Sequence, residues 1–286
     1  MTVLALVLVI TGAIIHAIWN LLVKRSAGGW LFVWAYSATS SVFYFPLALW
    51  AVLTAKAVWS LTTLGFVLAS GVLHIGYSLL LQTGYRRGGL SVVYPVARGV
   101  GPALSVVGAI AFLGEKLTLP TAAGAAFVVS GVMIIGLARP QNSSEPVWPG
   151  IRWGAAIGLF IAGYTLNDGA AVRLFAVSPI IIDYFGNFVR VALLAPMALR
   201  NRAGLREEFA KSRNQILLVG ALIPIPYILA LYAMKLAPIS VIAPARELSM
   251  LAGVFLAWRF LNEGDMVRRL IGALLIAAGV ATLSFG

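Results

Sequence analysis

The chain consists of apolar runs of about 20 residues separated by short charged or Pro/Gly-rich links, and this pattern restricts its fold more than any other feature. Hydrophobic residues make up 61% of the sequence and charged residues only 10%. A run of this length crosses the apolar core of a bilayer as one α-helix. The sequence therefore predicts an all-α membrane protein with ten transmembrane helices, near 2–23, 31–53, 60–84, 91–113, 118–138, 153–172, 178–199, 214–234, 238–260 and 267–285.

The two halves of the chain carry the same pattern of charged and helix-bending residues. Residues 94–116 return at 243–264, and the arginine and the glutamate of each copy are 17 residues apart. The corresponding residues are Pro95 with Pro244, Arg98 with Arg246, and Glu115 with Glu263. A charged arginine inside an apolar run costs free energy unless it pairs with an anion or is hydrated. The repeated arginines therefore point to a shared internal cavity.

The distribution of cations predicts how the repeats cross the membrane. Fourteen Lys and Arg residues lie in the links after the first, third, fifth, seventh and ninth spans, and four lie in the other links. The positive-inside rule places the fourteen in the cytoplasm and both termini outside. We predict a five-helix repeat at 1–139, a cytoplasmic linker at 140–152 and a second five-helix repeat at 153–286. Because five is odd, the second repeat is inverted around a central cavity.

Composition excludes several classes of function. The chain has no cysteine, which excludes disulfides, thiolate metal sites and cysteine nucleophiles. No Ser/His/Asp arrangement or phosphate-cradling loop is present, so we expect no enzyme activity, no cofactor and no metal site. The net charge of +12 would suggest a nucleic-acid partner in a soluble protein, but here the cations lie at helix ends. We expect a lipid bilayer and no nucleic acid as partners.

Two arginines lie deep in their predicted spans. Arg98 and Arg246 are each roughly 10–12 Å from the end of the span. Each arginine either contacts a substrate in the cavity, or it pairs with a carboxylate or with the carbonyls of a broken helix. Glu247 adjoins Arg246, but neighbours on a helix diverge by about 100°, so Glu247 needs another partner.

Further polar residues lie on single faces of the predicted spans. Asp183, Asn187 and Arg190 share one face, which favours a hydrogen-bonded network over direct ligand contact. Asp168 lies near the outer end of its span, where interfacial solvation accounts for it. His74 and Ser78 share an inward stripe, and His74 is either a proton carrier or a neutral hydrogen-bonding residue.

Aromatic, proline and glycine residues complete the pattern. The tyrosines that fall within spans either line a binding site or fill space between helices; they are Tyr77, Tyr94, Tyr164 and Tyr227. Pro95 and Pro244 remove amide donors inside two spans, so we predict hinges there. Small residues repeat at an interval of seven in the fifth and tenth spans, at Gly124, Gly131, Gly272 and Gly279. This interval predicts that these spans dock against each other or against a second protomer, so the protein is a monomer or a homodimer.

Ten spans in two repeats, each with a proline-containing fourth helix that ends in a glutamate turn (LGEKLT at 113–118 and LNEGDM at 261–266), resemble the EamA family of the drug/metabolite transporter superfamily. The resemblance covers nearly the whole chain. It implies a carrier of the bacterial inner membrane that works by alternating access, with spans 3, 4, 8 and 9 around the cavity. It also implies a likeness to bacterial exporters of amino acids, including aromatic ones.

Together these features lead to the hypothesis of a secondary transporter that exports small metabolites, most plausibly amino acids. In this hypothesis Arg98 or Arg246 binds the carboxylate of the cargo and Glu247 or Asn187 its amine. The remaining site is formed by His74, Ser78, Tyr77, Tyr94, Tyr164 and Tyr227. The alternative is efflux of lipophilic cations, for which Glu247 is the only candidate carboxylate deep in a predicted span. A passive channel is a third possibility.

Overall fold

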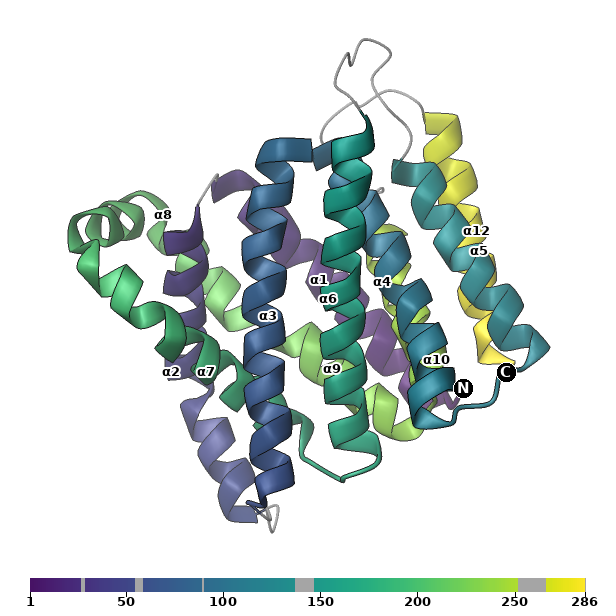
Figure 1. Ribbon diagram of the computed structural model, residues 1–286, viewed down its shortest axis with the longest axis horizontal. Coiled ribbons are helices and arrows are strands. Elements are labelled where there is room, and N and C mark those ends of the chain that lie inside the picture. Colours follow the sequence, from purple (N-terminus) through teal and green to yellow (C-terminus); the bar gives the residue numbers. More distant parts are fainter. Residues whose placement is uncertain (27–28, 55–58, 89, 137–146, 252–265, 286) are drawn as a thin grey trace.

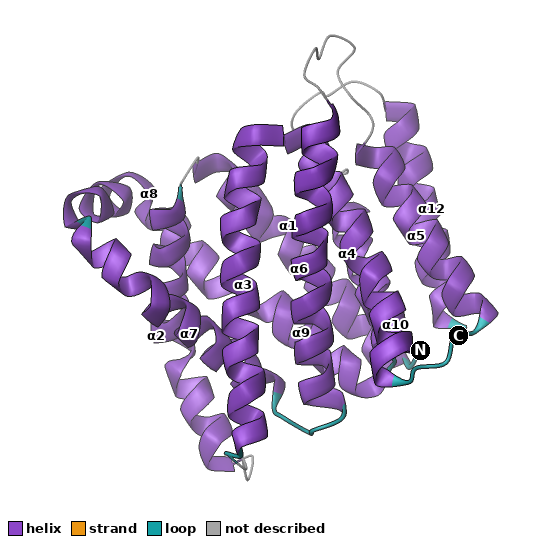
Figure 2. Ribbon diagram, viewed as in Figure 1, coloured by secondary structure: helices purple, strands orange, loops and turns teal. Residues whose placement is uncertain are grey.

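The computed structural model describes residues 1–26, 29–54, 59–88, 90–136, 147–251 and 266–285, and their regular structure is entirely helical (Figure 2). In chain order the elements are α1 (Val3–Ser26), α2 (Trp30–Thr54), α3 (Leu61–Gly88), α4 (Leu90–Leu113), α5 (Leu119–Gly136), α6 (Val147–Arg173), α7 (Pro179–Arg200), α8 (Arg202–Leu222), α9 (Pro224–Leu236), α10 (Ile239–Ala245), the short 3-10 helix η1 (Arg246–Leu248) and α12 (Met266–Ser284).

The helices pack side by side as a bundle, with α3 and α6 in the middle of the view in Figure 1. Helices α2, α7 and α8 lie on one side of this pair, and α5 and α12 lie together on the other. α6 packs closely against both α3 and α4, and α1 packs against α9. The two ends of the chain meet, because the Met1 amino group donates to the Ser284 carbonyl oxygen at 2.9 Å.

The outer surface of the bundle is apolar. Six of the described stretches are long and apolar enough to cross a bilayer. Large apolar side chains are widely exposed on several helices; examples are Val42, Leu53, Leu61, Phe112 and Leu119, each more than two-thirds exposed. Exposed apolar surface on this scale is stable only against lipid or another protein. The chain is therefore an all-α, membrane-embedded protein, as the sequence predicts.

Two segments differ from the sequence-based prediction. Residues 200–213, expected to be a link, are largely helical: α8 begins at Arg202, where the side chain of Asn201 accepts a hydrogen bond from Gly204 N at 3.1 Å. Such a side-chain cap satisfies one of the free amides at the start of a helix, so a polar sequence can continue as a helix there. The expected span 214–234 is divided at Ile223, directly before Pro224, because proline cannot donate the next helical hydrogen bond.

Close packing of glycines joins α5 to α12. A Cβ atom on Gly131 would lie 2.5 Å from the Gly272 carbonyl oxygen, and one on Gly124 would lie 2.8 Å from that of Gly279. The contacts run in opposite directions along the two helices, so α5 and α12 are antiparallel. The prediction that these glycines form a docking face within the chain is confirmed.

Some predicted features lie outside the described residues. These are Glu263 with most of its LNEGDM turn, the second part of the expected span 238–260, and residues 140–146 of the expected linker. The remainder of that linker, from Val147, belongs to α6.

Candidate functional site

Asp168 is the centre of a polar cluster inside the bundle. Its side chain is fully buried, and its Oδ2 atom accepts hydrogen bonds from Ser70 Oγ at 2.9 Å and from the Tyr227 hydroxyl at 2.5 Å. Oδ1 accepts from Asn167 Nδ2 at 2.8 Å. Helices α3, α6 and α9 thus meet at one carboxylate. The expectation that interfacial solvation accounts for Asp168 is wrong, because its side chain is fully buried.

A cluster of aromatic side chains adjoins this carboxylate through Tyr227. The His74 ring stacks on Tyr164, with centroids 4.2 Å apart, and Tyr227 meets both rings edge to face. Tyr77 adds a fourth ring, at 5.7 Å from Tyr164. Residues Tyr164 and Asp168 are four apart on α6 and therefore share one face. Three of the four tyrosines expected inside the spans are thus brought together.

His74 is connected to Asp168 through Ser70. Its Nδ1 atom lies 2.9 Å from the Ser70 carbonyl oxygen, which can only accept, so Nδ1 carries a hydrogen. The same nitrogen is 3.4 Å from Ser70 Oγ, which in turn donates to Asp168. Ser78, one turn further along α3, donates its hydroxyl to the His74 carbonyl oxygen at 2.8 Å.

Arg98 is paired with Glu247. Nε of Arg98 lies 2.9 Å from Oε2 of Glu247, although the N–H is not aligned for a hydrogen bond, and a second guanidinium nitrogen donates to Ser249 Oγ at 2.8 Å. The guanidinium also lies 5.9 Å from the centre of the Tyr94 ring. Glu247 has the separate partner that its position beside Arg246 requires.

Arg246 has a different environment. Its guanidinium carbon lies 5.1 Å from the centre of the Tyr227 ring, and the described residues place no carboxylate within 4 Å of it. Tyr227 therefore has the Arg246 cation over its ring and the Asp168 carboxylate at its hydroxyl. Its side chain remains partly exposed, as do those of His74, Tyr77 and Arg246.

Asn187 belongs to another network. Its amide nitrogen donates to the Ser37 carbonyl oxygen at 3.0 Å and to Ser41 Oγ at 2.8 Å, and its amide oxygen accepts from Arg190. These bonds join α7 to α2 and include Asn187 and Arg190 of the expected network. Because these bonds already use the amide group of Asn187, we leave it outside the proposed binding site.

The two prolines expected to be hinges lie in different parts of their helices. Pro95 is buried inside the continuous helix α4, whereas Pro244 lies near the end of α10, directly before the 3-10 turn that carries Arg246 and Glu247. The start of α10 is held by Glu115, whose two carboxylate oxygens accept from Ile239 N at 2.7 Å and from Ser240 N at 2.9 Å. The structure thus places a charged cap before α10 and a break after it.

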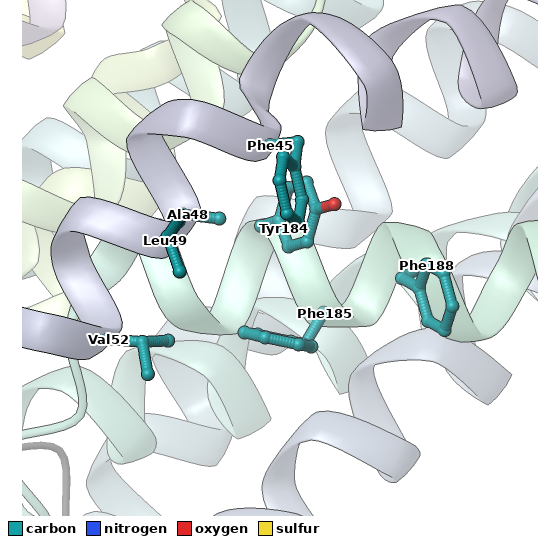
Figure 3. Close-up of a pocket in the computed structure, with 7 residues that line it drawn as sticks. All are labelled: Phe45, Ala48, Leu49, Val52, Tyr184, Phe185 and Phe188. Atoms are coloured by element: carbon teal, nitrogen blue, oxygen red, sulfur yellow. The ribbon is translucent and has the colours of Figure 1, made fainter.

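One described cavity, of about 290 Å³, lies away from the polar cluster. It is an apolar groove between α2 and α7, lined mainly by Phe45, Leu49, Tyr184, Phe185 and Phe188 (Figure 3). Its lining offers no charged group to a polar ligand. Within the described residues no group of three or more His, Asp and Glu side chains is placed to hold a metal ion.

Sequence reasoning missed Asp168, Ser70 and Ser249. The signal for Asp168 was its position four residues after Tyr164, on the same helical face. Ser70 stands four residues before His74 and could have been found by extending the stripe of α3 by one turn. Nothing in the sequence indicates that Ser249 meets Arg98, since that contact depends on the 3-10 turn after α10.

Comparison with known proteins supports the fold and leaves the activity open. No family model matches the chain. An uncharacterized protein of Methanocaldococcus jannaschii, MJ1333.1, is 35% identical over 76 residues, which are 27% of this chain and 55% of that protein, so the match spans about half of the relative. A solved structure described only as a crystal structure of a protein has a TM-score of 0.76 at 14% identity, covering 98% of this chain and 96% of its own. This second likeness concerns the fold alone.

Proposed function

We propose that the protein is a secondary transporter that exports zwitterionic amino acids by alternating access, with its cargo bound beside Tyr227 so that Arg246 contacts the cargo carboxylate and Asp168 its ammonium group. The observation that carries this proposal is the position of Tyr227, which has a cation over its ring and a carboxylate at its hydroxyl. An amino acid carries the complementary charges on two adjacent groups. Arg246 can present two parallel donors to the cargo carboxylate, and Asp168 can accept from its ammonium group.

The pairing of Arg98 changes the roles expected from the sequence. Glu247 is already neutralised by Arg98, so neither residue offers a free charge to the cargo. Arg246 and Asp168 replace them in the proposed site, with His74, Tyr77 and Tyr164 as the surface for the cargo side chain. Aromatic rings at this position favour apolar or aromatic amino acids. The partial exposure of His74, Tyr77 and Arg246 supports access of water to this region.

We further propose that the bundle consists of two inverted five-helix repeats, as in the EamA family that the sequence resembles. Arg98 and Arg246 are 148 residues apart, and adding the same offset to Gly124 and Gly131 gives Gly272 and Gly279. The glycine contacts support the repeat, because Gly124 meets Gly279 and Gly131 meets Gly272. The relative from Methanocaldococcus jannaschii is about half as long as this chain, because the 76 matched residues are 55% of it. A shorter relative of this kind also favours a duplicated unit. Inverted repeats around a midplane site allow access from each side in turn. On this proposal the protein resides in the bacterial inner membrane.

The experiment is transport of labelled L-phenylalanine into liposomes that contain the purified protein. Arg246→Ala removes a charged hydrogen-bond partner of the cargo, and we expect uptake to fall at least about tenfold. N-acetyl-L-phenylalanine lacks the ammonium group and phenethylamine lacks the carboxylate, so neither should compete with L-phenylalanine in the wild-type protein. Normal uptake by Arg246→Ala, or equal competition by both analogues, would contradict the proposed site.

Efflux of lipophilic cations is the second candidate, and the aromatic rings around Asp168 favour it. A carboxylate beside the ring cluster of His74, Tyr164 and Tyr227 suits an organic ammonium ion, which gains from ring faces as well as from charge. Such a cargo does not need Arg246. If Arg246→Ala preserves transport of phenethylamine or a quaternary amine while wild-type protein ignores L-phenylalanine, cation efflux replaces amino-acid export.

A further inference from the structure

Asp168 is a fully buried carboxylate without an ion pair among the described residues. A lone ionised carboxylate inside an apolar bundle costs several kcal/mol unless hydrogen bonds or a proton stabilise it. The three groups that contact it are neutral: the hydroxyls of Ser70 and Tyr227 and the amide of Asn167. This setting differs from that of Glu247, which has the Arg98 guanidinium beside it.

The neighbours of Asp168 can satisfy both of its protonation states. With an ionised carboxylate, Ser70, Tyr227 and Asn167 all donate to it. With a protonated carboxyl, one hydroxyl turns and accepts the new hydrogen, because the Ser and Tyr O–H groups rotate about the C–O bond and each oxygen has free lone pairs. If Ser70 is that hydroxyl, its own hydrogen turns away from the carboxyl. No backbone change is needed for the proton to bind or leave.

Charged and titratable groups face Asp168 from each neighbouring element. They are His74 of α3, Tyr164 of α6, Asp183 of α7, Tyr227 of α9 and Arg246 of η1, with Arg98 of α4 held by Glu247. Arg246 lacks a carboxylate partner among the described residues, and Tyr227 stands between it and Asp168. A proton on Asp168 therefore meets no direct competition from a bound guanidinium.

We propose that Asp168 is the site of the coupling proton, which it exchanges for the ammonium group of the cargo; this rests on the proposed function for the cargo but not for the proton. As cargo enters from the cytoplasm, the O–H bond of the protonated carboxyl breaks, the proton passes to water, and the cargo N–H donates to the carboxylate. On the opposite side a proton from the periplasm binds the carboxylate and releases the cargo. One proton thus moves inward for each cargo molecule exported.

The geometry favours a proton over a metal cation as the coupling ion. A bound cation needs several oxygen lone pairs that converge on one point. Ser70, Tyr227 and Asn167 already direct hydrogens toward three of the roughly four lone-pair positions of the Asp168 carboxylate, at 2.5–2.9 Å, so one position is left for a proton or a single ammonium N–H and too few for a metal cation. We therefore expect coupling to protons and not to Na⁺.

Acid-minus-base infrared difference spectroscopy of the reconstituted protein tests the proton site without any cargo. We expect a carboxylic C=O band that Asp168→Asn removes and that Asp183→Asn, an aspartate on the neighbouring helix, leaves in place. Tyr227→Phe deletes one hydrogen bond to the carboxyl and should raise the frequency of this band, which keeps the test valid if Asp168→Asn does not fold. An unchanged spectrum in Asp168→Asn, or an unshifted band in Tyr227→Phe, overturns the proposal.

Transport assays in liposomes distinguish a failure of proton coupling from a failure of the proposed function. In liposomes of fixed lipid composition, a pH gradient should drive accumulation of L-phenylalanine by wild-type protein, and Asp168→Asn should reduce this accumulation at least about tenfold. Replacing Na⁺ by choline should have no effect, and a requirement for Na⁺ would overturn the proton assignment. Equal gradient-driven accumulation by Asp168→Asn would overturn the coupling. If wild-type protein moves no amino acid, the proposed function fails, and the infrared band alone then decides whether the proton site stands.

Discussion

Arg98 of α4 and Glu247 of the turn after α10 form an ion pair, with Nε and Oε2 2.9 Å apart. Both side chains are largely buried, so the pair joins α4 to the segment that carries Arg246. Removal of one partner leaves a buried charge alone, which costs about 3 kcal/mol or more. Replacement of both by apolar residues of similar size can be nearly neutral.

We therefore expect Arg98→Met and Glu247→Leu each to lower the thermal stability of the detergent-solubilised protein, and the double variant to recover much of the loss. The measurement is the midpoint of thermal unfolding for each single variant and for the double variant. If the losses of the two single variants simply add in the double variant, the residues do not stabilise each other, and the structural role of the pair is wrong.

The contact between α5 and α12 gives a second prediction. A Cβ atom at Gly131 would lie 2.5 Å from the backbone oxygen of Gly272, and backbone can move away only if the helices separate. Gly131→Ala should therefore lower the unfolding midpoint. Gly65→Ala is the matched control, because a Cβ atom there meets nothing within 4 Å and alanine is favoured over glycine in a helix by up to about 1 kcal/mol. Equal effects of the two variants would mean that close helix packing does not limit stability.

Glu115 provides a third prediction, about local rather than global stability. Its carboxylate accepts from two free amides at the start of α10, Ile239 N and Ser240 N. Loss of such a cap costs about 1 kcal/mol. Glu115→Ala should therefore increase hydrogen exchange in peptides that cover 239–245, while peptides from α2 exchange as before. Uniformly faster exchange would indicate general destabilisation, and unchanged exchange would remove the capping role.

The sequence allowed the coarse fold and several contacts to be predicted. The apolar runs predicted membrane-embedded helices, and the spacing of Gly124, Gly131, Gly272 and Gly279 predicted the contact between α5 and α12, because both depend on local pattern. Burial of Asp168 depends on the packing of α3 and α9 against the end of α6. The position of a residue along α6 does not reveal which helices pack there. The partner of Arg98 was equally hidden, since the 3-10 turn that carries Glu247 joins segments far apart in the sequence.

The errors at 200–213 and 214–234 have local causes. Residues 202–213 are too polar for a span, yet Asn201 caps a helix there and the chain remains helical, with one non-helical residue at Ser212. Hydropathy finds segments that enter lipid, and it does not distinguish a polar helix from a loop. The break at Ile223 follows from Pro224, whose missing amide hydrogen was visible in the sequence, although hydropathy alone joined the two helices.

The orientation in the membrane can be tested because the chain has no cysteine of its own. The loop after α6 holds the exposed residue Phe175, and the polar start of α8 holds the exposed residue Glu207. Arg200, Arg202 and Arg206 lie near Glu207, whereas Arg173 is the nearest cation to Phe175. The positive-inside rule therefore places Glu207 in the cytoplasm and Phe175 outside. A membrane-impermeant maleimide should label Phe175→Cys in intact cells but label Glu207→Cys only after the membrane is opened. The reverse pattern would mean that the orientation is inverted, and with it the proposed direction of export, because the proposed exchange takes its proton from the side on which Phe175 lies.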